Sequence, residues 1–150
     1  MSKINVELIK KLREETGAPI VRVKEVLEAF EGDEGKALEV LRKEGFEKAE
    51  KRVDRETGQG KIFTYSHHTG KIVAVVELLC ETDFVAKNEL FETLGKDIAM
   101  QAASMGEENI KEQEFIKDPS KRISDLVKGV IAKTGENVRI GRVIRVELGK

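Results

Sequence analysis

The apolar residues of the first 45 positions fall into three short runs, in which they recur every three or four residues. This spacing places the apolar side chains of each run on one face of an α-helix. The runs are separated at Thr16–Pro19 and at Gly32–Asp33, where Gly permits a left-handed turn and Pro or Asp favours a new helix start. We therefore expect a three-helix module, similar in shape to a ubiquitin-associated domain, over residues 1–45, with its last helix ending at Gly45. Its predicted core positions are Ile4, Leu8, Ile9, Leu12, Ile20, Val23, Leu27, Phe30, Ala37, Leu38 and Leu41.

Ile20 and Val21 are adjacent at the start of the second helix. Neighbouring residues of one helix cannot both point into the same core. We expect Ile20 to join the core and Val21 to form part of a contact surface, because small helical modules of this kind usually serve as docking devices.

Residues 46–58 carry mainly charged and small side chains, with only a thin apolar seam at Ala49 and Val53. This composition predicts a solvated helical linker, which ends where Gly58 and Gly60 permit a sharp change of direction.

The following residues have the alternation and composition of β-strands. Residues 61–66 and 72–80 are separated by His67–Gly70, which predicts an antiparallel hairpin. Both faces of the second strand are apolar apart from Glu77, and the chain has enough helix to cover only one of them. We therefore expect a second copy of the protein, or a partner, to cover the other face.

The remainder of the chain predicts two helices and one more strand. Apolar positions from Leu90 to Met105 form one helical stripe, and those from Ile123 to Ile131 form another, which we expect to open at Asp118–Pro119. Residues 138–148 alternate, with Val138, Ile140, Ile144, Val146 and Leu148 expected on a single apolar face. Residues 59–150 are thus predicted to form an α+β unit, with a three-stranded antiparallel sheet and two main helices.

The short stretch Thr82–Asn88 lies between the most apolar strand and the first of these helices. One interpretation is that Asp83 caps a helix and Phe84 belongs to the core. The other is that Asp83 and Phe84 form an exposed wedge, a charge and a ring presented together on a rigid edge. The residue pattern alone leaves both interpretations open.

Composition and charge exclude several classes of function. The net charge of −1, from 27 basic and 28 acidic residues, argues against a general nucleic-acid surface. No phosphate-binding loop, nucleophile–base arrangement or metal-ligand spacing stands out, and His67–His68 reads as surface loop. Cys80 lies in an apolar run and reads as a small buried hydrophobe. We expect a soluble cytoplasmic protein that is not an enzyme, with no catalytic residue, metal, cofactor, nucleic acid or membrane partner.

Three motifs together resemble one family. The stretch Thr82–Asn88 reads TDFVAKN, residues 8–18 contain LIKKLR followed by TGA, and Gly135–Val138 reads GENV ahead of Arg142. These stretches are similar to the signatures of the bacterial elongation factor Ts family, the nucleotide-exchange factors for elongation factor Tu. The chain departs from the family pattern at Pro19, where Gly is usual, and at Arg22, where Asp is usual. It resembles a short form without a second α+β half or a coiled-coil excursion, and Gly106–Phe115 is expected to mark the place of the missing residues.

The resemblance implies a function and a set of site residues. Thr82, Asp83, Phe84 and Val85 would form a wedge that disturbs the magnesium and phosphate site of elongation factor Tu and promotes GDP release. Arg13, Ile20 and Val21 would dock on its nucleotide-binding domain. Short members of the family pair through their sheets, which implies a homodimer. The alternative is a helical adaptor whose α+β unit only dimerises and has no exchange activity; a weaker alternative is an RNA-binding factor.

Overall fold

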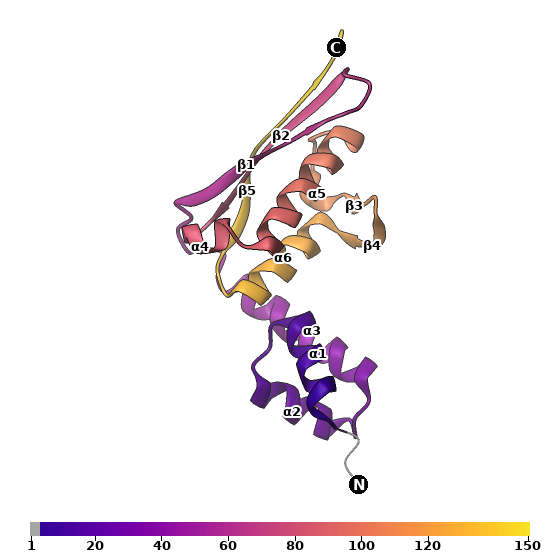
Figure 1. Ribbon diagram of the computed structural model, residues 1–150, viewed down its shortest axis with the longest axis vertical. Coiled ribbons are helices and arrows are strands. Elements are labelled where there is room, and N and C mark those ends of the chain that lie inside the picture. The colour runs from indigo at the N-terminus through magenta and orange to yellow at the C-terminus, as the bar shows by residue number, and fades with distance from the viewer. Residues whose placement is uncertain (1–3) are drawn as a thin grey trace.

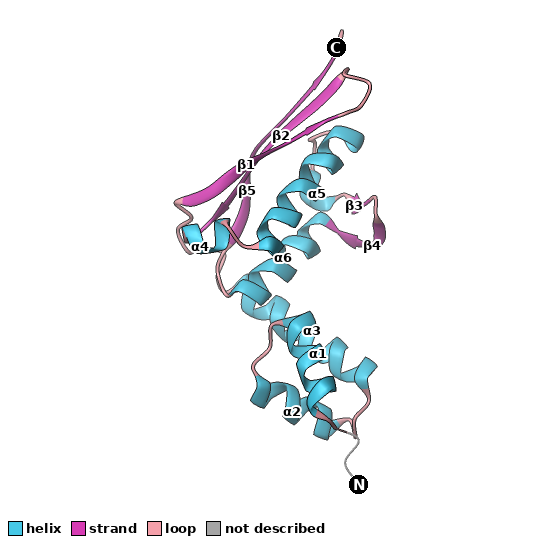
Figure 2. Cartoon of the chain, in the orientation of Figure 1, coloured by secondary structure: helices cyan, strands magenta, loops and turns pink. Residues whose placement is uncertain are grey.

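The computed structural model describes residues 4–150 and has the predicted α+β architecture (Figures 1 and 2). The helices are α1 (Val6–Thr16), α2 (Ile20–Ala29), α3 (Glu34–Glu50), α4 (Asp83–Ala86), α5 (Glu89–Met105) and α6 (Ile123–Thr134), with a 3-10 turn η1 (Ile110–Glu112). The strands are β1 (Gln59–Ser66), β2 (Ile72–Cys80), β3 (Glu114–Phe115), β4 (Asp118–Arg122) and β5 (Val138–Glu147). Among these described residues, no helix is long and apolar enough to cross a membrane.

The first three helices form in the predicted order, and side-chain caps or a left-handed glycine hold several of their ends. The Asn5 side chain accepts a hydrogen bond from the Leu8 N–H at the start of α1, and Asp33 does the same for Lys36 at the start of α3. Gly17 ends α1 in the left-handed conformation, with φ of 73°. The apolar faces meet in a small core of Ile9, Leu12, Val23, Val26, Leu27, Ala37 and Leu41.

Helix α3 does not end at Gly45 as expected but continues to Glu50. Gly lowers helix stability without ending a helix when tertiary packing supports the following turn. Here the continuation brings Ala49, which is only 1% exposed, into the second core. The expected linker is therefore helical only as far as Glu50, and turns follow over residues 51–55. The division into units of residues 1–45, 46–58 and 59–150 stays a prediction.

Helices α5 and α6 pack on one face of a three-stranded antiparallel sheet with strand order β1-β2-β5, and Figure 1 shows the other face without cover. Ala74, Val76, Leu78 and Cys80 of the central strand β2 are fully buried against the helices. The predicted hairpin is confirmed, with Ser66 paired to Val73 next to the turn. Burial raises the pKa of the Cys80 thiol, which behaves as a small core residue.

Strand β5 does not keep one apolar face along its whole length. The β2–β5 register shifts between Val76 and Leu78, so the faces of β5 exchange after Gly141–Arg142. Val138 and Ile140 point into the core, whereas Ile144, Val146 and Leu148 are 50%, 61% and 71% exposed on the outer face. The expectation of a single apolar face was wrong, because two consecutive residues oppose one residue of β2 at the bulge.

Asp118–Pro119 does not open a helix. These residues lie in β4, which pairs with the two-residue strand β3, and α6 starts only after Arg122. The Asp118 side chain accepts hydrogen bonds from the backbone and hydroxyl of Ser120, which favours an extended turn over a helical one. The buried Gln101 fastens this excursion to α5, since its amide bonds Gln113 and the backbone of residues 114 and 116.

The three-helix unit packs closely against the second unit along α6. The Gly45 position of α3 lies so near α6 that an added Cβ would stand 3.1 Å from the Ala132 Cβ. Next to it, Lys128 of α6 lies over the Phe46 ring at 5.9 Å and pairs with Glu50 at 3.3 Å. Gly17 at the end of α1 also meets α6, because a Cβ there would come within 2.7 Å of the Lys133 Cα. The position of α1 and α3 is thus fixed relative to the sheet.

Candidate functional site

Phe84 is the most exposed large apolar side chain of the described chain, at 83%. It lies in α4, a single helical turn at the end of the sheet next to β1 and β2 (Figure 1). The interpretation of Phe84 as a core residue was wrong, because Phe91 on α5 fills that place and packs against Phe63 at 5.9 Å. A Phe ring left in water forgoes about 1.5–3 kcal/mol of burial free energy, so its exposure on an ordered turn indicates a contact surface.

The residue before Phe84 is an exposed acid, and the two residues after it are buried. The Asp83 side chain is 60% exposed, and Lys87 one turn later lies 3.9 Å from its carboxylate. Asp83 is not the cap of α4; that position belongs to Thr82, whose hydroxyl accepts from the Val85 N–H at 3.3 Å. Val85 and Ala86 are buried, at 8% and 5% exposure. Of the four residues predicted for the wedge, Asp83 and Phe84 are thus available to a partner, and Val85 anchors the turn in the core.

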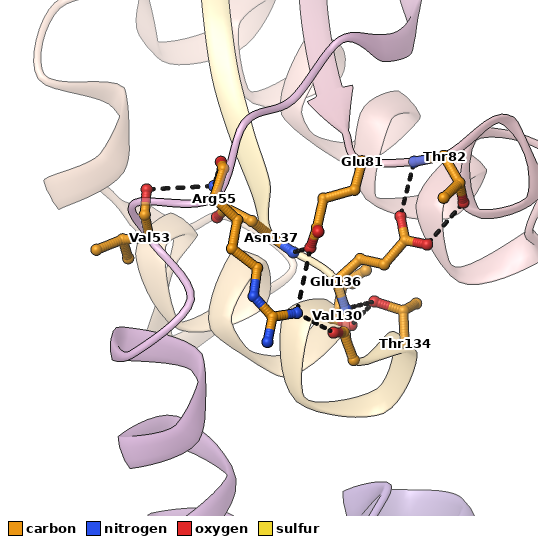
Figure 3. A network of polar contacts seen from close by, with 9 residues as sticks. Val53, Arg55, Glu81, Thr82, Val130, Thr134, Glu136 and Asn137 are labelled. Atoms are coloured by element: carbon orange, nitrogen blue, oxygen red, sulfur yellow. Dashed lines mark hydrogen bonds and ion pairs between the residues drawn. The ribbon is translucent and has the colours of Figure 1, made fainter.

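A network of polar side chains joins this turn to the connection between α6 and β5 (Figure 3). The Glu136 carboxylate accepts from the backbone N–H and hydroxyl of Thr82, at 2.9 and 2.6 Å. The Glu81 carboxylate accepts from the Asn137 N–H and pairs with Arg55 at 3.7 Å. The motifs contain Thr82, Glu136 and Asn137, but a single sequence gives no sign that these residues touch.

Arg13, Ile20 and Val21 lie on the surface of the three-helix unit. Ile20 is 46% exposed and Val21 67% exposed, and Arg13 is also exposed. The expectation that Ile20 belongs to the core was wrong. Ala18, just before α2, packs against the core instead, so the first turn of α2 presents both Ile20 and Val21 to solvent.

Arg22, where the resemblance implies Asp, is hydrogen-bonded to α3 and to the next turn of its own helix α2. Its guanidinium donates to the Glu44 carboxylate on α3, with Nε 2.8 Å from Oε1, and to Glu25 at 3.0 Å. The hydrogen bond from the Arg22 guanidinium lowers the pKa of Glu44. Arg22 therefore joins α2, the helix that exposes Ile20 and Val21, to α3.

An open cleft of about 1190 Å³ lies beside the contact between the three-helix unit and the second unit. The end of α1 contributes Thr16 to its lining, α3 contributes Phe46, and the junction of α4 and α5 contributes Asn88 and Leu90. The cleft thus runs from the helix that carries Arg13 to the residues that directly follow the exposed turn.

Across residues 4–150, no group of three His, Cys, Asp or Glu side chains is placed to hold a metal ion. The His67 and His68 rings in the hairpin loop are tilted by 54° with their centroids 4.3 Å apart, and the Tyr65 hydroxyl lies 3.3 Å from His67 Nδ1. The exposed Phe84 ring and Asp83 carboxylate of α4 suit binding to another macromolecule by shape and charge.

Comparisons with known proteins extend over almost the whole chain. The family profile described as Elongation factor TS matches residues 81–150. A protein named Elongation factor Ts from Leptospira biflexa is 39% identical, with 97% of this chain and 98% of that protein covered. Proteins of the same name from Thermosipho melanesiensis and Thermotoga maritima are 36% and 37% identical, with 98% and 99% of this chain and 100% and 98% of those proteins covered. The alignment with the Leptospira protein has 194 positions, more than the 150 residues of this chain, so that relative carries residues without a counterpart here.

Proposed function

The chain belongs to the elongation factor Ts family, and we propose that it binds elongation factor Tu and accelerates the release of GDP from it during translation elongation. The observation that carries this proposal is Phe84, 83% exposed on a turn whose other apolar residues are buried. A side chain in this position is free to enter an apolar pocket of a partner. In this account no bond is made or broken, and exchange follows from binding alone.

The proposed wedge combines two kinds of interaction. Phe84 enters an apolar pocket of elongation factor Tu and displaces a helix there. Asp83, whose side chain is 60% exposed, brings a negative charge toward the groups that order the magnesium ion and the phosphate loop. A carboxylate disturbs such a site because the nucleotide phosphates are themselves anionic and depend on the metal for neutralisation.

The wedge alone does not supply enough free energy. A 10⁴-fold acceleration needs about 5.5 kcal/mol of differential binding between the empty and the GDP-loaded partner. Full burial of one Phe contributes about 1.5–3 kcal/mol. The remainder must come from other contacts, and the exposed residues Arg13, Ile20 and Val21 on the rigidly packed three-helix unit are our candidates. By reciprocity, GDP weakens the binding of this protein by the same factor.

We further propose that a second copy of the chain covers the outer face of the sheet. Ile62, Val73, Ile144, Val146 and Leu148 leave this face apolar and between 36% and 71% exposed. A sheet with two apolar faces needs cover on both. The short form of the family, as the resemblance implies, pairs in this way.

The exchange function is tested by the release of a fluorescent GDP analogue from elongation factor Tu in excess magnesium. Adding this protein should increase the release rate by several orders of magnitude, in a saturable manner. A stable complex that leaves the release rate unchanged would contradict the proposal and would favour the adaptor alternative, in which the three-helix unit only docks.

A further inference from the structure

Helix α4 is too short to be ordered by its own hydrogen bonds. It has four residues, a single turn, and the first turn of a helix fixes several backbone dihedrals for one hydrogen bond. The direction in which Phe84 points must therefore be fixed by the groups that hold the two ends of α4. At the C-terminal end, Asn88 starts α5 and its side chain accepts from the Leu90 N–H at 2.8 Å. The N-terminal end depends on Thr82.

The Thr82 hydroxyl has two partners, and one of them determines its direction. Its oxygen lies 2.6 Å from Glu136 Oε2, which accepts the only hydroxyl proton, and 3.3 Å from the Val85 nitrogen, which donates to it. The other carboxylate oxygen, Oε1, accepts from the Thr82 backbone N–H at 2.9 Å. Because both carboxylate oxygens of Glu136 accept from Thr82, Glu136 fixes the rotamer of Thr82. A lone pair of the Thr82 hydroxyl then remains free to accept from the N–H groups of α4.

Glu136 is held in turn by the sheet. The last pair of the β2–β5 ladder is Cys80 with Val138, so the register places Glu81 opposite Asn137 and Thr82 opposite Glu136. Beyond this last pair, side-chain carboxylates replace backbone carbonyls: Glu81 accepts from the Asn137 N–H and Glu136 accepts from the Thr82 N–H. Figure 3 shows these contacts side by side.

Asn137 closes the network on the side of the core. It is 2% exposed, and its amide donates to the carbonyl oxygens of Val53 and Arg55, at 3.2 and 2.9 Å. The α6–β5 connection that carries Glu136 is therefore held by Asn137, independently of its contact with Thr82. A rigid support of this kind is needed where one ring must enter a partner at a set angle.

We propose that Glu136 is a positioning residue for the exchange wedge, which acts through Thr82 to fix the direction of α4 and of Phe84. This inference rests on the proposed exchange function, and it concerns the order of the wedge, not the docking of the chain. It assigns to Glu136 a role separate from contact with the partner. Loss of the carboxylate should leave the complex able to form but slow the step in which the nucleotide leaves.

The first test measures the order of the wedge without the partner. The chain has no Trp, so Phe84→Trp introduces a single indole at the tip of the wedge. Its fluorescence anisotropy should fall when Glu136→Ala is added. The matched control is Glu112→Ala, which removes an exposed carboxylate that lies 3.1 Å from Arg122, away from the wedge, and should leave the anisotropy unchanged. Unchanged anisotropy with Glu136→Ala would overturn the inference.

The second test uses the chain with Phe84 in place and separates docking from release. Glu136→Ala should lower the maximal rate of GDP release from elongation factor Tu about tenfold, the size expected for a lost charge-assisted hydrogen bond. The concentration of Glu136→Ala that gives half-maximal release should stay within about twofold of that of the unmodified chain. For the control Glu112→Ala, both the maximal rate and the half-saturating concentration should stay within about twofold of the unmodified chain. An unchanged maximal rate, or a loss confined to half-saturation, would overturn the inference.

A second variant and the anisotropy of the first test distinguish a folding defect, or a failure of the exchange function, from a failure of this inference. If Glu136→Ala does not fold, Glu136→Gln retains an acceptor for the Thr82 N–H and should give the same changes in smaller measure; no change in either value would overturn the inference. If the unmodified chain fails to accelerate release, the exchange function itself is wrong, and the anisotropy still decides whether Glu136 orders α4.

Discussion

Phe84 and Val21 are apolar side chains left in water on helices that are otherwise anchored in a core. Phe84 is 83% and Val21 67% exposed, whereas Val85 and Val23 close by are buried. Two such residues on separate units suggest two contact points with one partner. We expect them to have different roles: Val21 and its neighbours would bind the partner, and Phe84 would change its conformation.

The docking residues should affect the affinity of the complex more than the release step. We expect the double change Ile20→Ser and Val21→Ser to weaken the complex about tenfold or more, since each buried aliphatic side chain contributes about 1.5–3 kcal/mol. Arg13→Ala should act in the same direction. Isothermal titration with elongation factor Tu measures the dissociation constant.

The matched control for this change is Val6→Ser. Val6 is 80% exposed at the opposite end of α1, so its loss should not alter the affinity. A double variant that binds as tightly as the unmodified chain would remove these residues from the interface.

At the scale of elements, the sequence predicted most helices and strands but not the places where tertiary contacts override a local signal. The caps at Asn5, Asp33 and Asn88 and the exit at Gly17 act within a few residues, and α1, α3 and α5 begin at these caps. The continuation of α3 beyond Gly45 depends instead on α6, for example on the contact of Glu50 with Lys128, which lies 78 residues later in the chain. A single sequence carries no information on that contact.

Two further misses have the same origin. The bulge in β5 depends on Glu77 of β2, which accepts from the backbone and the guanidinium of Arg142. The strand at Asp118 depends on pairing with β3 and on Gln101. The same limit applies to the candidate site. The sequence left open whether Phe84 is exposed or buried, and it gave no sign of the contact between Thr82 and Glu136.

The bulge leads to a prediction on pH. The hydrogen bonds from Arg142 lower the pKa of Glu77 to about 2, from an ordinary value of 4.5. Because the folded-state pKa is depressed, this carboxylate stabilises the fold above its unfolded value, and the contribution is lost as pH falls from about 4.5 through about 2. The melting temperature of Glu77→Gln should therefore lie below that of the unmodified chain at pH 7.

This difference in melting temperature should shrink as the pH is lowered from 5 toward 2, and Arg142→Ala should show the same trend. Both are measured by circular dichroism. A difference that stays constant across this pH range would show that Arg142 does not hold the Glu77 carboxylate.

The packing of α1 on α6 also makes a measurable prediction. Gly17→Ala should destabilise the fold, because the residue has φ of 73° and its Cβ would lie 2.7 Å from the Lys133 Cα. Gly70→Ala is the matched control, since Gly70 has φ of 72° with no atom within 4 Å of the added Cβ.

Both variants place an alanine in the left-handed conformation, so they share that backbone strain. Only Gly17→Ala also overpacks the contact with α6, which should lower its free energy of unfolding by a further ~1–3 kcal/mol. Urea unfolding should show this difference in the free energy of unfolding. Equal losses would mean that the three-helix unit is not packed on α6 in solution.

At the scale of the whole molecule, the elongated chain places the three-helix unit at one end and the uncovered sheet toward the other, with α4 at an edge of the sheet (Figure 2). A second copy on the outer sheet face would leave the docking surface and the wedge of each chain free. One dimer would then be able to bind two partner molecules.

The dimer is tested with a charge on the outer face. Val146→Lys should convert a dimer into a monomer at tens of micromolar protein in sedimentation experiments, because a buried unpaired ammonium opposes association. Ile116→Lys, at a site 41% exposed away from the sheet, should leave the dimer intact. An unmodified chain that sediments as a monomer would contradict the proposed pairing.

The role of Phe84 is tested by the maximal rate of GDP release from elongation factor Tu in the presence of saturating Phe84→Ala. We expect a rate about tenfold or more below that of the unmodified chain, with the variant still folded and still bound, because the lost burial of about 1.5–3 kcal/mol acts on the release step. An unchanged maximal rate would contradict the wedge and would leave the chain as a docking protein.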